Sequence, residues 1–302
     1  MLIVSLIELK EAEVIIKELG YLPLAIEQAG AYIWAQGASF AEYLLEYKNN
    51  FQSVTEKKPE GLEGYATVYT TWQISLEAIK AENPQATELL YLYGFLSNDV
   101  SDELILHGAE WQILESNGKK QLKKCIELLL SYSVVKRDGG KNRVWIHPVV
   151  HEWTRQHLTT SEKQEQTKHA LNIVFKYIDQ HSKQENSEKM LVVARNILPD
   201  VEACVKNVID YLQDKPEFNQ GSWKHLMALG DFLQSRGIYG LSCAIAKMLN
   251  NEHKRCLGCE HLDTLQSMNT LAILYRHQGK YADTETLYKE ALVEGLTLSH
   301  AS

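Results

Sequence analysis

The stretch Met268-Asn-Thr-Leu-Ala-Ile-Leu-Tyr-Arg-His-Gln-Gly-Lys-Tyr281 matters most for the fold, because a related stretch stands 42 residues before it. Chemically similar residues recur at this separation: Leu229 and Leu271, Gly230 and Ala272, Phe232 and Leu274, Gly237 and Gly279, and Tyr239 and Tyr281. Each copy has the pattern of a helix, a short turn with glycine, and a second helix. A fixed period of this length is typical of stacked helical repeats. Unrelated amphipathic helices that match by chance are the alternative.

The composition of the whole chain favours helices. Its 302 residues are 45% hydrophobic and 23% charged, as in ordinary globular proteins, and this length predicts two or three domains. Six prolines and 17 glycines are too few for a turn-rich all-β protein. The net charge of −8 argues against nucleic acid or anionic lipid as partners.

Cysteine content and hydropathy indicate the compartment. The five cysteines are an odd number in a chain too large to need disulfides, so we expect reduced thiols. No uncharged apolar run reaches the length of a membrane span. We therefore expect a soluble, cytoplasmic protein without a membrane partner.

Helical spacing also recurs before the repeat. It predicts helices over residues 6–20, from Pro23 onward, over 70–96 with a break at Asn83, and over 119–130. Ser39 and Glu42 have the spacing of a capping box at the start of a further helix.

One segment has strand character. The β-branched runs 133–137 and 143–146 flank Asp138-Gly-Gly140, which predicts a β-hairpin and the only strands that we expect. A helix from Pro148 to Leu158 follows. Helices leading into a small hairpin, with another helix after it, are the winged-helix arrangement.

The second copy of the repeat resembles a tetratricopeptide repeat, through the stretch quoted above and Leu287-Tyr-Lys-Glu-Ala-Leu292. The 42-residue period and the preceding His261-Leu-Asp-Thr-Leu265 are similar to the kinesin-light-chain subtype. Ser242 and Thr284 stand where that family usually has alanine. The resemblance implies a groove between paired helices that binds a protein or peptide. We expect four residues of this copy to contact it: Asn269, Tyr275, Arg276 and Tyr281.

The N-terminal half resembles NB-ARC signalling ATPases, especially fungal NOD-like receptors. Leu19-Gly-Tyr-Leu-Pro-Leu-Ala-Ile26, with Gln28-Ala-Gly30, is similar to their Gly-Leu-Pro-Leu segment. Thr71-Trp-Gln-Ile-Ser-Leu76 and Leu128-Leu-Leu-Ser-Tyr-Ser-Val-Val135 look like their winged-helix part. Ile146-His-Pro-Val-Val-His-Glu-Trp153 falls where they carry a Met-His-Asp-like motif.

In that family an ADP sits between the ATPase core and the helical and winged-helix domains. The resemblance implies that Pro23 packs near the adenine and that His147 reaches the diphosphate, where an imidazole can donate to an anionic oxygen. Pro148 replaces the family's usual aspartate.

The phosphate-binding loop of such ATPases is missing. It requires Gly-x4-Gly-Lys-[Ser/Thr], and the Gly-Lys pairs at 118, 140 and 279 lack both the earlier glycine and the following hydroxyl residue. We therefore expect no enzymatic activity and no cofactor, since ADP would need a core not present here. The chain looks like the C-terminal side of a receptor ATPase, with its repeat array truncated.

Two groups of residues suggest metal sites. Cys256 and Cys259 lie between His253 and His261, which provides four possible zinc ligands or a redox pair. All four fall within nine residues, whereas zinc sites usually draw on two separated segments, so a plain linker between helices is the favoured interpretation. The pair His147 and His151 is four residues apart and lacks a third convergent ligand.

A basic cluster raises the possibility of DNA binding, because a winged helix can place one helix in the major groove. The cluster lies on one predicted helix: Lys119, Lys120, Lys123 and Lys124. The acidic net charge favours a solvated helix face instead.

The sequence thus predicts a mainly α protein. We expect a helical segment over 1–60, a winged-helix-like domain over 61–160, a helical linker over 161–224 and two tetratricopeptide-like repeats over 225–302. The expected function is a non-catalytic protein-interaction and regulatory module. An ADP/ATP-switched signalling ATPase whose nucleotide core lies outside this chain is the first alternative, and a winged-helix DNA binder is the second.

Overall fold

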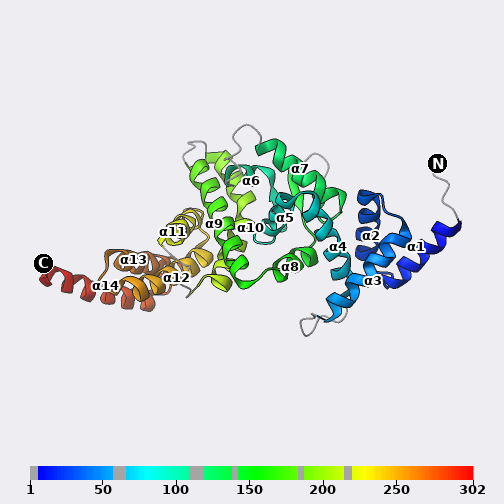
Figure 1. The fold of residues 1–302 in the computed structure, drawn as a ribbon. Helices are drawn as coiled ribbons and strands as arrows, with labels where there is room; N and C mark the ends of the chain where they lie inside the picture. The colour runs from blue at the N-terminus through cyan, green and yellow to red at the C-terminus, as the bar shows by residue number, and fades with distance from the viewer. Residues whose placement is uncertain are drawn as a thin grey trace. The chain divides into compact units, whose positions relative to one another are not determined.

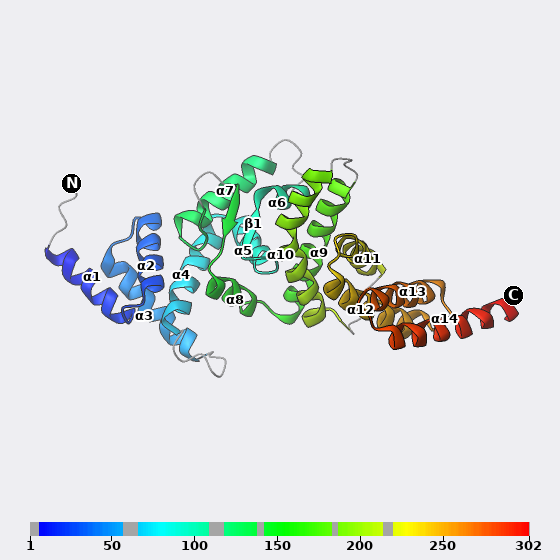
Figure 2. The ribbon, with the colours of Figure 1, turned by 180° about the vertical axis from the view of Figure 1, so that it is seen from behind.

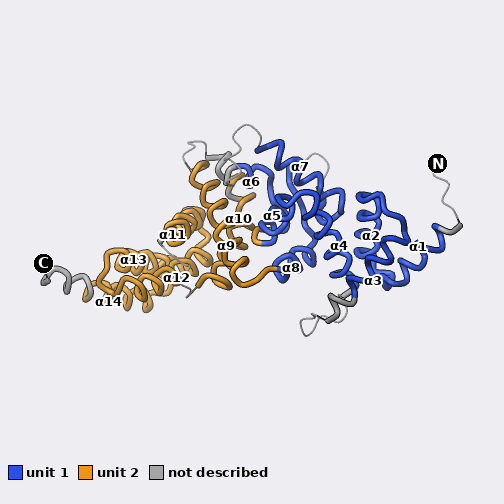
Figure 3. The backbone as a smooth tube through the Cα atoms, in the orientation of Figure 1, with its two compact units in different colours: residues 1–94, 98–106, 110–157 blue, residues 95–97, 107–109, 158–302 orange. Residues whose placement is uncertain are grey.

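The computed structural model describes residues 6–56, 66–108, 118–137, 142–182, 187–213 and 220–301. Fourteen helices and one two-stranded sheet occupy these residues, which confirms the mainly α class. The chain forms two compact units, coloured separately in Figure 3. Unit 1 comprises residues 1–94, 98–106 and 110–157, and unit 2 comprises residues 95–97, 107–109 and 158–302.

Unit 1 begins with α1 (Leu6–Glu18), α2 (Pro23–Gln36) and α3 (Phe40–Glu56). Pro23 suits the first turn of α2 because the missing N–H has no helical acceptor there. The predicted capping box of α3 is confirmed: the Glu42 carboxylate accepts from the Ser39 N–H at 2.7 Å, and Ser39 Oγ accepts from the Glu42 N–H at 3.2 Å.

The next two helices supply much of the core of unit 1. They are α4 (Ala66–Glu82) and α5 (Pro84–Tyr93), divided at Asn83, whose side chain accepts from the Gln85 N–H at 3.1 Å. The break expected at this asparagine is therefore confirmed. Trp72 of α4 is fully buried, and its ring lies 5.6 Å from that of Trp153.

The remaining elements of unit 1 are β1 (Asp99–Ser101), α6 (Asp102–Gly108), α7 (Gly118–Ser131), β2 (Arg143–Trp145) and α8 (Pro148–Gln156). The two strands pair antiparallel, with Val100 opposite Val144. Both valines are fully buried, so this short sheet holds the segments on either side of α6 and α7 in the core.

The sheet differs from the predicted hairpin. Of residues 133–137, only Lys136 pairs with β2, through an isolated bridge to Trp145 with N–H···O bonds of 2.7 and 2.8 Å. The predicted turn at 138–141 lies outside the described residues. The main partner of β2 is β1, whose sequence Asp-Val-Ser has a single β-branched residue and so gave no strand signal.

The described part of unit 2 is built from six helices. They are α9 (Thr160–Ser182), α10 (Ser187–Tyr211), α11 (Gln220–Ser235), α12 (Tyr239–Leu257), α13 (Leu262–His277) and α14 (Tyr281–Ala301). The helix α9 packs against both α10 and α11, and the chain then continues in contact from α11 to α14. Figures 1 and 2 show α11 to α14 side by side from opposite directions.

The helices of the part that the structure describes do not include a membrane span. None of them combines the length and the apolar composition that crossing a bilayer requires.

Candidate functional site

A groove opens in unit 2 where α11, α12 and α13 meet. Its lining residues come from all three helices: Met227, Gly230, Asp231, Ser242, Ile245, Ala246, Leu249, Gln266, Ser267 and Thr270. The contribution of α12 is mostly apolar and buried, whereas Gln266 and Thr270 offer polar side chains nearer the surface. An apolar concavity with a few polar groups at its edge is typical of a binding site.

Small residues bring the paired helices close beside this groove. The Ser242 hydroxyl donates to the Gly230 carbonyl oxygen at 3.0 Å, joining α12 to α11. A Cβ at Gly230 would lie 3.5 Å from Ile245, already at van der Waals contact, so a larger side chain would push the helices apart. Ser242 therefore joins the two helices of this pair.

The second helix pair repeats this bond 42 residues later. The Thr284 hydroxyl lies 3.4 Å from the Ala272 carbonyl oxygen, and it also donates to its own helix at Lys280, at 2.9 Å. Both hydroxyl residues are buried. We call the bonds Ser242–Gly230 and Thr284–Ala272 the pair clamps.

The turns of the two pairs also share one geometry. Gly237 and Gly279 have φ values of +75° and +74°, the left-handed region that glycine adopts without strain. Each glycine closes its first helix with two backbone bonds, from the glycine N–H and from the N–H of the next residue. The 42-residue spacing in the sequence therefore marks equivalent backbone conformations.

Among the residues that line the groove, Asp231 is the one with a charged side chain. No lysine, arginine or histidine is among them. Much of Asp231 is exposed, yet its carboxyl group lies against the groove wall, and this partial loss of hydration raises its pKa above the ordinary value. The groove therefore combines an apolar base with one acidic group.

None of the four residues predicted to contact a partner lines the groove. Asn269 is exposed on α13 beside the lining residue Thr270, and Arg276 is exposed in the last turn of that helix. Tyr275 is half-buried, with the ammonium groups of Lys247 and Lys280 at 5.3 and 5.6 Å from its ring centre. Tyr281 begins α14 and is 69% exposed. Sequence reasoning missed the lining contributed by α11 and α12.

In unit 1, α2 contacts the turn that follows α7. The segments over residues 19–30 and 128–135, which resemble parts of NB-ARC proteins, therefore meet. The buried Gln28 of α2 donates from Nε2 to the carbonyl oxygen of Ser133, which has a φ of +52° in the turn after α7. Gln36 donates to the Tyr132 hydroxyl in the same turn. An ion pair of 2.8 Å joins Lys136 to Glu27. The amides of α2 thus hold a turn whose conformation is unfavourable for a residue with a side chain.

Pro23 and His147, the two residues predicted to contact ADP, begin different helices of unit 1. Pro23 opens α2 two residues after Tyr21, which has a positive φ, as does Gly20 before it. His147 caps α8: its Nδ1 accepts from the Val149 N–H at 3.2 Å. This bond assigns the proton of the neutral ring to Nε2, so a half-buried His147 presents a donor.

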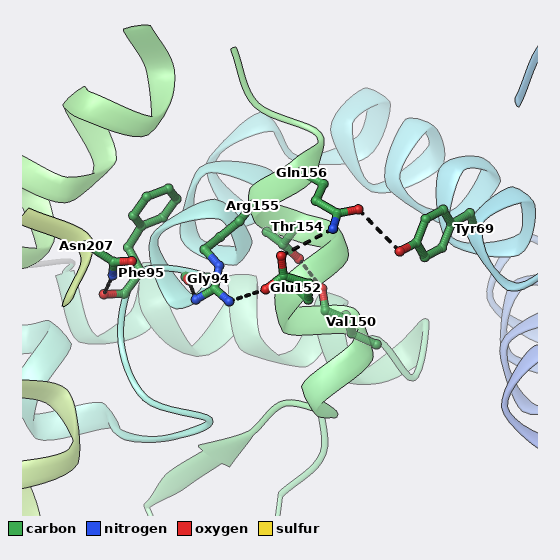
Figure 4. Close-up of polar contacts among 9 residues, drawn as sticks. All are labelled: Tyr69, Gly94, Phe95, Val150, Glu152, Thr154, Arg155, Gln156 and Asn207. Atoms are coloured by element: carbon green, nitrogen blue, oxygen red, sulfur yellow. Dashed lines mark hydrogen bonds and ion pairs between the residues drawn. The ribbon is translucent and has the colours of Figure 1, made fainter. Parts of the chain in front are cut away.

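The C-terminal turns of α8 are fastened to α5, as Figure 4 shows. Arg155 donates from Nη1 to the Gly94 carbonyl oxygen at 3.3 Å and pairs with Glu152 through Nη2. Partial burial alone would raise the pKa of Glu152, but the hydrogen bond and charge of Arg155 hold it below the ordinary value. Gly94 permits this approach, since a Cβ there would lie 3.2 Å from the Thr154 methyl carbon.

The same helix contacts α4. Gln156 donates to Glu152 at 3.2 Å and accepts from the Tyr69 hydroxyl at 3.3 Å (Figure 4).

Within unit 2, Asn207 donates to the Phe95 carbonyl oxygen at 3.0 Å (Figure 4). The Tyr69 and Asn207 bonds join residues 87 and 112 positions apart, and no local pattern in the sequence marks them.

The cysteine and histidine residues at the end of α12 have structural roles or are exposed. His253 is buried between helices, where its Nδ1 lies 3.1 Å from the Asp263 carbonyl oxygen, and burial lowers its pKa. His261 caps α13 by accepting from the Asp263 N–H at 3.2 Å. Cys256 and Cys259 are exposed. Among the described residues, no group of three or more metal-ligating side chains converges.

The basic cluster of α7 is exposed. Its four lysines, Lys119, Lys120, Lys123 and Lys124, lie on the surface of that helix, and Lys123 is 3.6 Å from Glu127, one turn on. An exposed pair of this kind contributes little to stability.

Comparisons with known proteins bear on both units. A family model described as "Domain of unknown function (DUF7779)" matches residues 77–163. A "Nucleotide-binding leucine-rich repeat (NLR)-like protein" of the fungus Hyaloscypha variabilis is 27% identical over 271 residues, which cover 86% of this chain and 26% of that protein. The chain therefore spans about a quarter of the length of this relative. No solved structure matches the chain.

Proposed function

We propose that this chain is a non-catalytic protein-interaction and regulatory part of an NLR-type signalling protein. In this proposal, α4 to α8 form a winged-helix-like domain, and α11 to α14 form two tetratricopeptide-type repeats. The observation that carries the proposal is the groove between the clamped helix pairs. The likeness to an NLR-like protein over 86% of the chain supports the signalling context.

The chemistry of the groove suggests what kind of segment binds there. The buried side chains of Ile245 and Leu249 favour an apolar anchor, and Met227 is flexible enough to adapt to its shape. Asp231 favours a lysine or arginine next to that anchor, because the groove lining carries no cation to compensate its charge. We therefore propose a partner segment with an apolar side chain beside a basic one.

Variants of the groove test this assignment. Thr270→Trp fills the groove and Asp231→Lys reverses its charge, whereas Glu260→Lys makes the same charge change at an exposed position outside the lining. The full chain and each variant are immobilised, and proteins captured from an extract are quantified by mass spectrometry. We expect partners that bind the wild type and Glu260→Lys and are lost with both groove variants.

Circular dichroism of each variant verifies that the helices are intact. Partners captured equally by all four proteins would contradict the proposal, since they would bind elsewhere on the chain.

A second candidate is the sensor side of an ADP/ATP-switched ATPase. The observation that favours it is the orientation of His147, whose capping bond places the ring proton on the nitrogen that can face an anion. Isothermal titration of the full chain with ADP tests this idea. We expect no binding, because a phosphate-binding loop would supply most contacts to the diphosphate. Micromolar binding that His147→Ala abolishes would favour this second function.

A further inference from the structure

The five cysteines of the chain divide into two groups by their exposure. Cys125, Cys204 and Cys243 are buried, whereas Cys256 and Cys259 are exposed. Burial raises the pKa of each of the three buried thiols, which disfavours the reactive thiolate. Redox chemistry of the folded chain is therefore favoured at the exposed pair.

The exposed pair lies where α12 ends and the linker to α13 begins. Cys256 is in the last turn of α12, and Cys259 follows it after Leu257 and Gly258. The Cys-x-x-Cys spacing is that of thiol pairs that cycle between dithiol and disulfide.

Gly258, between the two cysteines, controls whether they can meet. Its φ of +88° and ψ of 166° give an extended backbone that leads the chain away from the end of α12. A disulfide requires the two Cα atoms to lie about 4.4–6.8 Å apart, so we infer that closing it requires Gly258 to rotate. A Cβ at Gly258 would meet no other atom within 4 Å, and glycine adopts φ values of either sign, so the linker has the space and the freedom to do this.

Gly258 also takes part in two hydrogen bonds at this junction. Its carbonyl oxygen accepts from the hydroxyl of the fully buried Thr264 at 2.7 Å, and its N–H donates to the Lys254 carbonyl oxygen at 3.2 Å. Rotation of Gly258 redirects its carbonyl group and takes the acceptor away from a buried hydroxyl, which costs free energy. The state of the two thiols is thus coupled to the first turn of α13.

This first turn leads directly into the groove. Gln266, Ser267 and Thr270 all line the groove and lie within two turns after Thr264 on α13. A change in the first turn of α13 would therefore alter where three of the lining side chains lie.

We propose that Cys256 and Cys259 form a thiol–disulfide site that low-molecular-weight disulfides such as glutathione disulfide oxidise, and that closing the disulfide loosens the first turn of α13. The consequence for binding in the groove rests on the proposed function, whereas the disulfide and the loosened turn do not.

The reaction consists of two thiol–disulfide exchanges. The thiolate of one cysteine attacks a sulfur of glutathione disulfide, which forms a mixed disulfide and releases one glutathione thiolate. The thiolate of the other cysteine attacks the protein sulfur of the mixed disulfide, closes the intramolecular bond and releases the second glutathione thiolate. Two electrons pass from the protein thiols to glutathione disulfide, and the two protons that the cysteines lose protonate the two leaving thiolates.

Peptide mass spectrometry of the full chain tests the disulfide. The reduced chain is incubated with glutathione disulfide, and the thiols that remain are alkylated after unfolding. We expect a bond between Cys256 and Cys259 that dithiothreitol reverses, with the three buried cysteines still present as thiols. Cys256→Ser should stop at a mixed disulfide of glutathione with Cys259, and Cys259→Ser at one with Cys256.

Hydrogen exchange tests the loosened turn. The amides of Asp263 and Leu265 both donate to His261 at the start of α13. We expect them to exchange about tenfold faster in the oxidised chain than in the reduced one, the effect of losing about one hydrogen bond that holds this turn. Thr264→Val removes that bond without oxidation, so it should raise the exchange of the reduced chain to a similar extent and leave little further increase on oxidation.

Two controls separate this site from other effects. The double variant Cys256→Ser, Cys259→Ser has no thiol at the exposed positions, so its exchange should be the same with and without glutathione disulfide. The groove variant Thr270→Trp should form the disulfide as the wild type does. Failure of the groove assignment and failure of this proposal are therefore distinguishable.

Three results would overturn the proposal. One is a wild-type chain that stays reduced or keeps glutathione on either cysteine, since the intramolecular bond would then not form. Another is a disulfide between two chains in place of one within the chain. The third is a disulfide that forms without any change in the exchange of Asp263 and Leu265, which would separate the thiols from α13.

Discussion

The two helix pairs of unit 2 have the same internal construction and different surroundings. Both carry a pair clamp, and both turn at a glycine with a φ near +75°. The first pair is covered on one side by α9 and on the other by α13, whereas α14 presents a tyrosine that is 69% exposed. The comparison teaches that the repeated pattern specifies a helix pair, while its neighbours decide whether a given residue belongs to the core or to the surface.

The largest effect is expected where the two pairs meet. Leu274 is fully buried in the cluster between them, and truncation to alanine should lower the free energy of unfolding by about 2–4 kcal/mol. Leu292→Ala, at an exposed position of α14, should change it by less than about 0.5 kcal/mol. Urea unfolding followed by circular dichroism measures both. Equal losses would show that Leu292 is as well packed as the interface between the pairs.

The turns should respond alike in both pairs. Gly237→Ala and Gly279→Ala each place a Cβ at a φ near +75° and should each cost about 1–2 kcal/mol. Gly240→Ala is the matched control, because that glycine lies inside α12 with open space around it and alanine favours helices by up to about 1 kcal/mol. Thermal unfolding of the three variants compares them. A clear difference between the first two would break the equivalence of the pairs.

Removing the pair clamp of the first pair should have an intermediate effect. Ser242→Ala leaves the Gly230 carbonyl oxygen without its side-chain donor and should cost about 1 kcal/mol. Thr286→Ala removes an exposed hydroxyl that bonds only within its own helix and should change stability by less than about 0.5 kcal/mol. The same urea titration applies. If Ser242→Ala is neutral, the clamp contributes no net stability and alanine would serve as well.

The smallest effect concerns the charge of Asp231. This charge distinguishes the two pairs, because the residue 42 positions later, Ile273, is uncharged. The pKa of Asp231 is raised in the folded chain, so folding favours its protonated form, and this contribution is lost as the pH rises through that pKa. Asp231→Asn should therefore be slightly more stable than wild type at neutral pH, by less than about 0.5 kcal/mol given its exposure.

The advantage of Asp231→Asn should vanish below the ordinary aspartate value of 3.8. Thermal unfolding across that pH range provides the measurement. An advantage that persists in acid would assign the effect to packing instead of charge.

Local signals in the sequence predicted the helices well. Pro23, the Ser39 and Glu42 box, and Asn83 each mark a helix start through chemistry confined to a few residues, and the structure has helices beginning at these places. The glycine turns of the repeat are predictable for the same reason, since a positive φ favours glycine.

Features that depend on distant contacts could not be predicted. The strand β1 forms because β2 lies beside it, and Gln28 finds its acceptor in Ser133, 105 positions away. The groove could not be predicted because the sequence does not show which faces of α11, α12 and α13 converge. His147 and His261 looked like candidate ligands by residue type, whereas in the structure both accept a backbone N–H at a helix start.

The junction between α9 and α11 depends on a ring contact between the two helices, and this has a consequence for how such genes change. An insertion ahead of α11 would separate His225 from Phe175 and expose both rings. The junction between α9 and α11 should therefore keep its length among related genes.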